Sequence, residues 1–155
     1  MSLETLKNQI AAITADIAGR ALDDVLEAEL NTRFGADSDA FSALAETCHR
    51  GVAEGWLCAR EAGGIKFGRA LKPGPETHGF SVDVVEMTDV VGPYHAHPKG
   101  EIDLVLPLDE GAEFDGRGAG WMVYGPGTEH APTVAGGGAR VLYLLPDGAI
   151  EFKKP

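Results

Sequence analysis

Hydrophobic residues in the first third of the chain recur at three- and four-residue steps, which is the spacing of one helix face. One such stripe spans residues 3–17, and a second begins at Leu22 and continues to Gly35. The Asp37–Ser38–Asp39 cluster then offers N-cap oxygens to a third helix, which we expect to extend to about Gly55. The pattern therefore predicts three amphipathic helices before the first strand.

After Trp56 the spacing changes to the alternation that is typical of β-strands. Gly63–Gly64 separates two strand-like runs and predicts a hairpin, and from Phe80 onward short apolar runs are separated by Gly, Pro and Asp. Many short strands with regular turns favour a closed sandwich or barrel. We therefore expect a mainly β fold, with a β-barrel domain in residues 57–155. Residues 1–56 would be a helical N-terminal segment that caps the barrel or forms a dimer interface, within a single compact unit.

A winged DNA-binding module also places helices before a hairpin and is an alternative to this organisation. The third predicted helix carries Glu46 and Glu54 with only Arg50 as a firm cation, which is a poor match to a helix that contacts phosphates. The whole chain has 24 acidic and 13 basic residues and a net charge of -11. Because phosphate binding needs clustered Lys and Arg, we expect no nucleic-acid partner and no anionic membrane partner.

The hydrophobicity of the first residues and the two cysteines indicate the cellular compartment. Residues 1–7 lack the long apolar core of a signal peptide, and no apolar run approaches the roughly 18 residues of a membrane span. Cys48 and Cys58 suit buried thiols in a reducing compartment. We therefore expect a cytoplasmic protein.

One short stretch carries a spacing that suits a metal ion. In an extended strand His95 and His97 point to the same face and can bind one cation through two imidazoles. The turn predicted at residues 98–100 would send the chain into a neighbouring strand and bring the carboxylate of Glu101 back toward these imidazoles. A His-x-His pair alone is more often a surface or core feature, so the added carboxylate matters.

A second turn, about thirty residues later, supplies a fourth candidate ligand. His130 follows the Gly125–Pro126–Gly127 turn and would leave one or two metal positions open for water or substrate. Imidazole ligands suit Zn, Fe, Mn and Ni to differing degrees, so the metal stays open. We expect one divalent metal ion per chain.

These two motifs, set among short apolar strands, resemble the paired motifs of the cupin superfamily over residues 79–152. The resemblance implies a double-stranded β-helix, which is a small β-barrel, with His95, His97, Glu101 and His130 as its metal ligands. The chain departs from the family pattern at turns and packing positions, for example at Asp89, where the first motif usually opens with Gly.

A closer resemblance extends over nearly the whole chain. Several segments are similar to the bacterial 4-hydroxylaminobenzoate lyase family: Glu61–Arg69, Lys72–Pro75, His78–Val85, Gly100–Asp103 and Gly118–Trp121. The resemblance implies the conversion of 4-hydroxylaminobenzoate to 3,4-dihydroxybenzoate (protocatechuate) with release of ammonia, a step in nitroaromatic degradation. The reaction adds one water without net redox change, so a metal Lewis acid could suffice.

An aromatic acid substrate needs a cation for its carboxylate and an apolar slot for its ring. Arg69 is the preferred carboxylate partner because guanidinium offers a bidentate fork, and Lys72 is the next candidate. Trp121 and Tyr124 are candidates for lining the slot. Surface charge and core packing are the alternative interpretations of these residues.

Three further residues are candidates for proton transfer. His78 titrates near neutrality, and the phenol of Tyr94 can donate a hydrogen bond. Asp103 shares the strand parity of Glu101 and would face the metal, where an acidic group is costly unless it is hydrogen-bonded or functional. A loop histidine such as His78 is, however, usually just solvated.

Two other functions fit the same ligands. Three His and one Glu can hold Fe(II), as in a cupin dioxygenase that acts on a small aromatic acid, and oxygen dependence would favour that reading. A ligand-binding or regulatory cupin would instead retain metal without turnover. Resemblance to cupins in general further suggests a homodimer.

Overall fold

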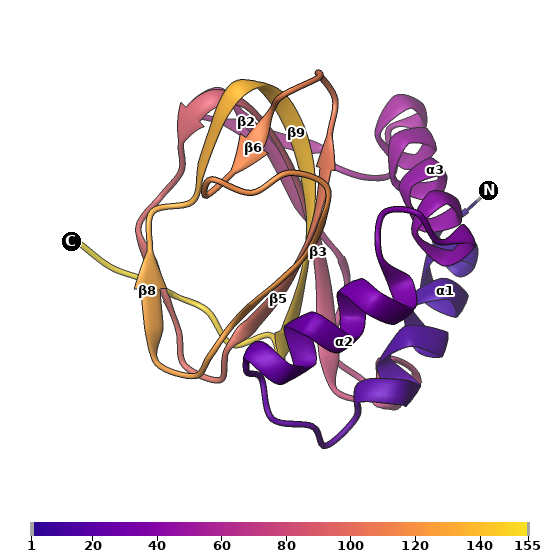
Figure 1. The fold of residues 1–155 in the computed structure, drawn as a ribbon. Helices are drawn as coiled ribbons and strands as arrows, with labels where there is room; N and C mark the ends of the chain where they lie inside the picture. The colour runs from indigo at the N-terminus through magenta and orange to yellow at the C-terminus, as the bar shows by residue number, and fades with distance from the viewer. Residues whose placement is uncertain (1, 155) are drawn as a thin grey trace.

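The computed structural model describes residues 2–154, in which three helices pack against one of two antiparallel β-sheets (Figure 1). The helices are α1 (Leu3–Ile17), α2 (Asp24–Phe34) and α3 (Asp39–Glu54), with a short 3-10 turn at Pro75–Thr77. The strands are β1 (Arg60–Ala62), β2 (Ile65–Leu71), β3 (Phe80–Val91), β4 (His95–His97), β5 (Glu101–Pro107), β6 (Glu113–Phe114), β7 (Gly120–Tyr124), β8 (Thr128–His130), β9 (Thr133–Pro146) and β10 (Glu151–Phe152).

The strands form a large and a small sheet. The large sheet has the order β1-β2-β3-β9-β5-β7, with β6 also paired to β9, and the small sheet has the order β10-β4-β8. The expected mainly β fold with an N-terminal helical segment is therefore confirmed. The expected closed barrel is wrong, because no strand pairing within residues 2–154 joins the two sheets. The fold is a β-sandwich.

The three helices begin and end where the sequence places capping residues. The side chain of Ser38 accepts a hydrogen bond from the backbone N–H of Phe41 at the start of α3, and Gly55 ends that helix with φ 87°. Ser2 and Asp23 cap α1 and α2 in the same way. The three predicted helices are confirmed, with α2 beginning two residues later than the hydrophobic pattern suggested.

The large sheet is buried on both faces. Along β5, Ile102 and Leu104 pack in one hydrophobic cluster with the helices, whereas Val105 packs in a second cluster on the other face. Because side chains alternate along a strand, Glu101 and Asp103 share the face of Val105, which looks toward the small sheet. The helices therefore cover the outer face, and the inner face is free to build a site.

Helix α2 covers the edge of the large sheet at β7. The amide of Asn31 accepts a hydrogen bond from the backbone N–H of Trp121 (2.8 Å) and donates one to its carbonyl (2.9 Å). A carboxylate oxygen of Glu27 accepts from the N–H of Val123 at 2.9 Å. Side chains of the helix thus satisfy backbone groups that an edge strand would otherwise leave unpaired.

The hairpin of β1 and β2 turns at Gly63 and Gly64, as predicted, and both glycines have positive φ. It does not stand apart as the wing of a DNA-binding module. Residues 66–71 of β2 pair with β3, so the hairpin is an edge of the large sheet.

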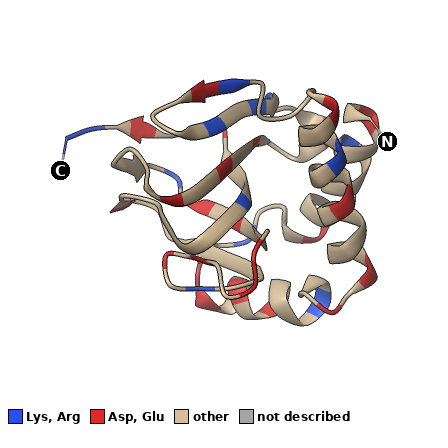
Figure 2. Cartoon of the chain, turned by 90° about the horizontal axis from the view of Figure 1, so that it is seen from above, with Lys and Arg blue, Asp and Glu red and all other residues tan. Residues whose placement is uncertain are grey.

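Charged residues lie on many elements of the surface. Figure 2 shows Lys and Arg on several separate elements among the more numerous Asp and Glu. Within residues 2–154, no helix combines the length and the apolar character needed to cross a membrane.

We predict that Asn31→Ala lowers the free energy of unfolding by about 1–3 kcal/mol, because it leaves the N–H and carbonyl of Trp121 without their partners. Urea denaturation measures this change. Asn8→Ala is the matched control, since Asn8 is an exposed residue of α1, and it should alter stability by less than about 0.5 kcal/mol. Equal effects of the two substitutions would show that α2 does not protect the sheet edge.

Candidate metal centre

The structure brings His95, His97, Glu101 and His130 together. One ligand atom from each of these side chains lies within 4.8 Å of every other. His95 and His97 are both on β4, and His130 on β8 pairs directly opposite His95. Glu101 begins β5 in the facing sheet. The group therefore spans the space between the two sheets.

The route from His97 to Glu101 differs from the expected one. The turn at residues 98–100 was expected to lead into a neighbouring strand, but it crosses from the small sheet to the large one. Gly100 has φ 90°, and a Cβ at this position would lie 2.8 Å from the carbonyl oxygen of Tyr124. Only glycine fits this turn without strain, and the crossing places the Glu101 carboxylate opposite the imidazoles.

Hydrogen bonds fix the protonation of the imidazoles of β4. His95 Nδ1 lies 3.0 Å from the carbonyl oxygen of Pro93, which can only accept, so Nδ1 carries the proton. His97 Nδ1 lies 3.0 Å from Oγ1 of Thr128, whose own proton is donated to the carbonyl of Gly125. His97 Nδ1 is therefore also the donor. In both rings the lone pair is left on Nε2.

The third imidazole is held by a carboxylate. His130 Nδ1 lies 2.6 Å from Oδ2 of Asp115, so Nδ1 donates and Nε2 keeps the lone pair. The Nε2 atoms of His130 and His95 are only 3.1 Å apart, and His97 Nε2 is 3.3 Å from Oε2 of Glu101. Three lone pairs and one carboxylate thus face one another.

This arrangement fits a bound cation. His97 and Glu101 are completely buried, and within residues 2–154 His97 Nε2 and both carboxylate oxygens of Glu101 have no hydrogen-bond partner. Buried acceptors without donors cost stability, and a divalent metal would satisfy all of them at once. Three imidazole nitrogens and one carboxylate are a ligand set that Zn and other divalent transition metals accept.

Asp103 lies beside Glu101 on the inner face, as its strand parity predicted. Burial and the negative charge of Glu101 raise the pKa of Asp103 well above its usual value, which favours its neutral form. Burial alone would also raise the pKa of Glu101, but His97, Asp103 and His95 hold it below its usual value. Glu101 is therefore the carboxylate that stays ionised.

Asp115 is a further residue of the site that the sequence did not predict. Its carboxylate accepts hydrogen bonds from His130 Nδ1, from the hydroxyl of Tyr124 and, at 2.9 Å, from the N–H of Thr133. Burial raises the pKa of Asp115, but these bonds hold it below its usual value. Its position in an irregular segment fifteen residues before His130 gave no signal in the sequence.

An apolar cavity of about 380 Å³ opens beside His95, which is one of its lining residues. Residues of both sheets form its walls, and the polar side chains of Arg69 and Asp83 lie among them. Its apolar lining comes mainly from seven side chains: Ile65, Phe67, Val85, Met87, Leu145, Ile150 and Phe152. A cavity of this size suits a small ligand.

Of the expected slot residues, only Tyr124 lies near the metal group. Its ring is 4.6 Å from that of His130 and 5.2 Å from that of His97, although it does not line the cavity. Trp121 does not line the cavity, and core packing, its alternative interpretation, describes its position. It packs on the helix side of the sheet, where its Nε1 donates to the carbonyl of Phe34 at 2.9 Å.

Three other candidates lie away from the cavity. His78 packs against α1 with Nδ1 2.9 Å from Oγ1 of Thr14, and Lys72 is an exposed residue. Tyr94 directly precedes His95 in the sequence, and its hydroxyl donates a hydrogen bond to the carboxylate of Glu129 at 2.8 Å. None of the three lines the cavity, where Lys72 was expected to bind the substrate carboxylate and His78 and Tyr94 to transfer protons.

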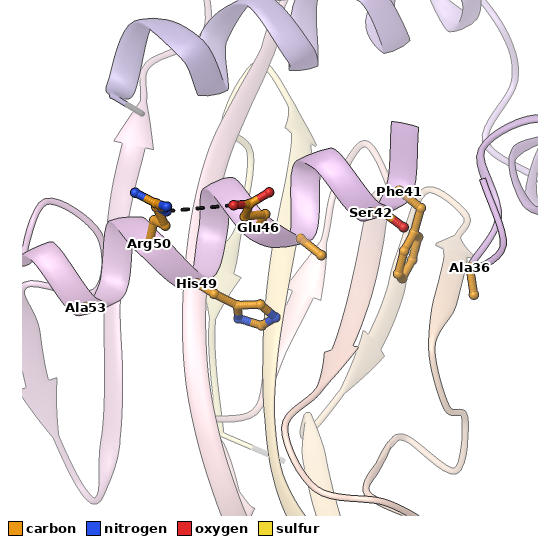
Figure 3. A pocket seen from close by; sticks show the side chains of 8 residues that line it. Ala36, Phe41, Ser42, Glu46, His49, Arg50 and Ala53 are labelled. Atoms are coloured by element: carbon orange, nitrogen blue, oxygen red, sulfur yellow. Dashed lines mark ion pairs between the residues drawn. The ribbon is translucent and has the colours of Figure 1, made fainter. Parts of the chain in front are cut away.

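A second, wider hollow lies along α3 (Figure 3). His49 lines it, but His49 Nδ1 accepts a hydrogen bond from Arg140 at 2.7 Å, and Glu46 and Arg50 form an ion pair across 3.8 Å. None of its lining residues belongs to the metal group, so this hollow is separate from the site.

Comparison with known proteins identifies relatives along almost the entire chain. The model of a family described as "PnbB: 4-hydroxylaminobenzoate lyase" matches residues 8–152. A 4-hydroxylaminobenzoate lyase of Pseudomonas putida is 32% identical, over 94% of this chain and 95% of that protein. A protein of the same name from Nocardioides sp. (strain LMS-CY) is 35% identical, over 88% of this chain and 86% of its own length.

Solved structures with a similar arrangement are more distant. An RmlC-like cupin protein from Ralstonia eutropha JMP134 superposes with a TM-score of 0.46 at 13% identity, over 62% of this chain and 64% of that chain. An oxalate oxidase in complex with glycolate gives 0.44 at 22% identity, over 59% and 56%. The match thus covers less than two thirds of each of these structures.

We predict that Asp115→Asn weakens metal binding by about 10- to 100-fold, because it removes the carboxylate that fixes the ring of His130. Titration of the metal-free protein with Zn²⁺ measures the dissociation constant. Asp147→Asn is the control, since Asp147 pairs with Lys99 on the surface and should leave the constant unchanged. An unchanged constant in Asp115→Asn would mean that His130 needs no such support.

Proposed function

The chain belongs to the 4-hydroxylaminobenzoate lyase family, and from this premise we propose that it converts 4-hydroxylaminobenzoate to 3,4-dihydroxybenzoate and ammonia with the help of a divalent metal. The reaction adds one water and releases one ammonia without net oxidation. It therefore requires a polar centre that handles the N–O group and a site that holds an aromatic acid.

One observation supports this proposal above the others. Residues of both sheets line the apolar cavity, and they include the cation Arg69 and His95, one of the four residues of the metal group. A benzoate with a polar para substituent has the same sequence of parts: a carboxylate, a flat apolar ring and a reactive polar group. The lining of the cavity offers a counterpart to each of these parts: Arg69, the apolar side chains and His95.

The carboxylate would bind at Arg69. Its Nε and Nη2 donate to Asp83 at 3.0 and 3.3 Å, and Nη2 also donates to the carbonyl of Gly148 at 3.3 Å. Asp83 thereby fixes one edge of the guanidinium, while Nη1 forms no hydrogen bond within residues 2–154. A guanidinium held in this way can offer its free donors to a second carboxylate without losing its orientation.

The ring would lie among the apolar side chains of the cavity. Phe67, Val85 and Met87 come from the large sheet, and Phe152 comes from the small sheet. The ring of Phe152 is 5.7 Å from that of His95, so it borders both the cavity and the metal group. Such walls exclude water from the ring and leave the polar group of the substrate beside the metal ligands.

His95, His97, Glu101 and His130 would hold the metal. A bound divalent cation supplies Lewis acidity at the N–O group and lowers the pKa of a coordinated water. The protein's own part is to keep three neutral imidazoles with Nε2 directed inward and Glu101 ionised, as the hydrogen bonds to Pro93, Thr128 and Asp115 favour.

We predict that the purified, metal-loaded protein converts 4-hydroxylaminobenzoate to ammonia and 3,4-dihydroxybenzoate under anaerobic conditions. His97→Ala should reduce turnover to the level of the blank, since it removes a buried ligand. His49→Ala is the control and should remain active, because His49 lies on α3 outside the cavity. Quantifying ammonia and the catechol product over time provides the measurement.

The outcomes distinguish the proposed lyase from its rivals. Turnover that requires oxygen would replace the lyase by an Fe(II) dioxygenase. Metal retention at one ion per chain without turnover of any hydroxylaminoarene would instead favour a ligand-binding or regulatory role.

We predict that Arg69→Met raises KM for 4-hydroxylaminobenzoate by about 10- to 100-fold, the loss expected for one charge-assisted hydrogen bond, and changes kcat less. Steady-state kinetics on a thermally stable preparation measures both constants. Arg50→Met, which removes an exposed arginine of α3, should leave KM unchanged. A KM of Arg69→Met within twofold of the wild-type value would contradict carboxylate binding at Arg69.

A further inference from the structure

Tyr143 lies where the cavity meets the metal group. Strand β9 lies between β3 and β5, and Tyr143 is in register with Asp83 on β3 and with Asp103 on β5. Residues of β3 form a wall of the cavity, whereas β5 carries Glu101 of the metal group. Tyr143 itself lines the cavity together with His95. Its side chain therefore belongs to both regions.

The hydroxyl of Tyr143 differs from those of the other two tyrosines. The hydroxyls of Tyr94 and Tyr124 donate to the carboxylates of Glu129 and Asp115. Tyr143 is only 6% exposed, yet its hydroxyl forms no hydrogen bond to any group within residues 2–154. Unlike the carboxylate oxygens of Glu101, this hydroxyl is not completely enclosed by protein, so it is free to donate to a group in the cavity that Tyr143 lines. A ligand in the cavity would provide the missing acceptor.

The surroundings keep this hydroxyl protonated. Burial and the negative charges of Asp103, Glu101 and Asp115 raise the pKa of Tyr143 well above its usual value. Tyr143 is therefore a donor, not an anion, throughout the neutral range. The ring of Tyr143 packs in the inner hydrophobic cluster, where its centroid lies 6.3 Å from that of the Phe114 ring.

We infer that Tyr143 is a catalytic residue whose hydroxyl donates a hydrogen bond to the oxygen of the para substituent of the bound substrate. The inference rests on the proposed function for the identity of that substituent, the hydroxylamino group. Arg69 and Tyr143 then hold the two ends of one para-substituted benzoate, with the ring between them. Discrimination for a polar para group follows from this geometry, because an apolar group would leave the hydroxyl unpaired.

The hydrogen bond would also accelerate the reaction. When the N–O bond breaks, the oxygen takes the bonding electron pair and gains negative charge. A fixed donor in a water-poor cavity stabilises that charge more than it stabilises the neutral substrate, and removal of one such donor typically costs about 100- to 1000-fold in kcat.

The test compares Tyr143→Phe with wild type, both loaded with metal. We expect kcat for 4-hydroxylaminobenzoate to fall by about 100-fold, with one metal ion per chain retained and the melting temperature nearly unchanged. Trp56→Phe is the matched control. It removes the ring N–H that donates to Glu54 at 3.1 Å, outside the cavity, and should keep wild-type kinetics. A kcat of Tyr143→Phe within threefold of wild type overturns the inference.

A binding measurement makes the test independent of turnover. Calorimetric titrations with 4-hydroxybenzoate and 4-methylbenzoate compare a polar with an apolar para group of similar size. Wild type should prefer 4-hydroxybenzoate by about tenfold, the effect of one hydrogen bond, and Tyr143→Phe should lose this preference. A preference that persists in Tyr143→Phe, or wild type that shows none, overturns the inference.

The two measurements separate this inference from the proposed function. A wild-type protein that turns over no 4-hydroxylaminobenzoate but prefers 4-hydroxybenzoate through Tyr143 refutes the substrate and supports the role of the hydroxyl. Full activity of Tyr143→Phe supports the lyase and refutes that role.

Discussion

Three imidazole lone pairs and one ionised carboxylate, directed at one another in a buried space, form the constraint on which the structure depends. Each ring is held with its Nδ1 proton directed outward, by Pro93, Thr128 or Asp115, so no ring can donate inward while it is neutral. A cation is the simplest partner for four such acceptors. The sandwich makes the arrangement possible, because β4 and β8 present the rings while β5 presents Glu101 from the facing sheet.

Much of this could be predicted from short-range patterns. The parity of a strand places His95 and His97 on one face, and this holds in any sheet of any curvature. Helix ends were equally local, since Ser38 and Gly55 act through backbone groups a few residues away. The hairpin at Gly63–Gly64 follows from the positive φ that its turn requires. These features depend on neighbours in the sequence, so they are the same whichever strands pair elsewhere in the fold.

The remaining features depend on which strands meet. In β7 the large sheet is buried on both faces, so the apolar pattern could not tell that Trp121 looks toward the helices. Asp115 reaches His130 only because the segment before β7 folds back onto β8, and Tyr143 sits inside an apolar run that reads as core. Whether the sheets close into a barrel likewise depends on which distant strands form hydrogen bonds. These features are therefore determined by strand topology and not by local propensity.

X-ray absorption spectroscopy of the protein loaded with one Zn²⁺ per chain tests the central claim most directly. The account predicts about three imidazole ligands and one carboxylate, at roughly 2.0–2.2 Å, with no sulfur neighbour. A zinc ion bound by one imidazole or none, or by sulfur at about 2.3 Å from Cys48 or Cys58, would contradict it.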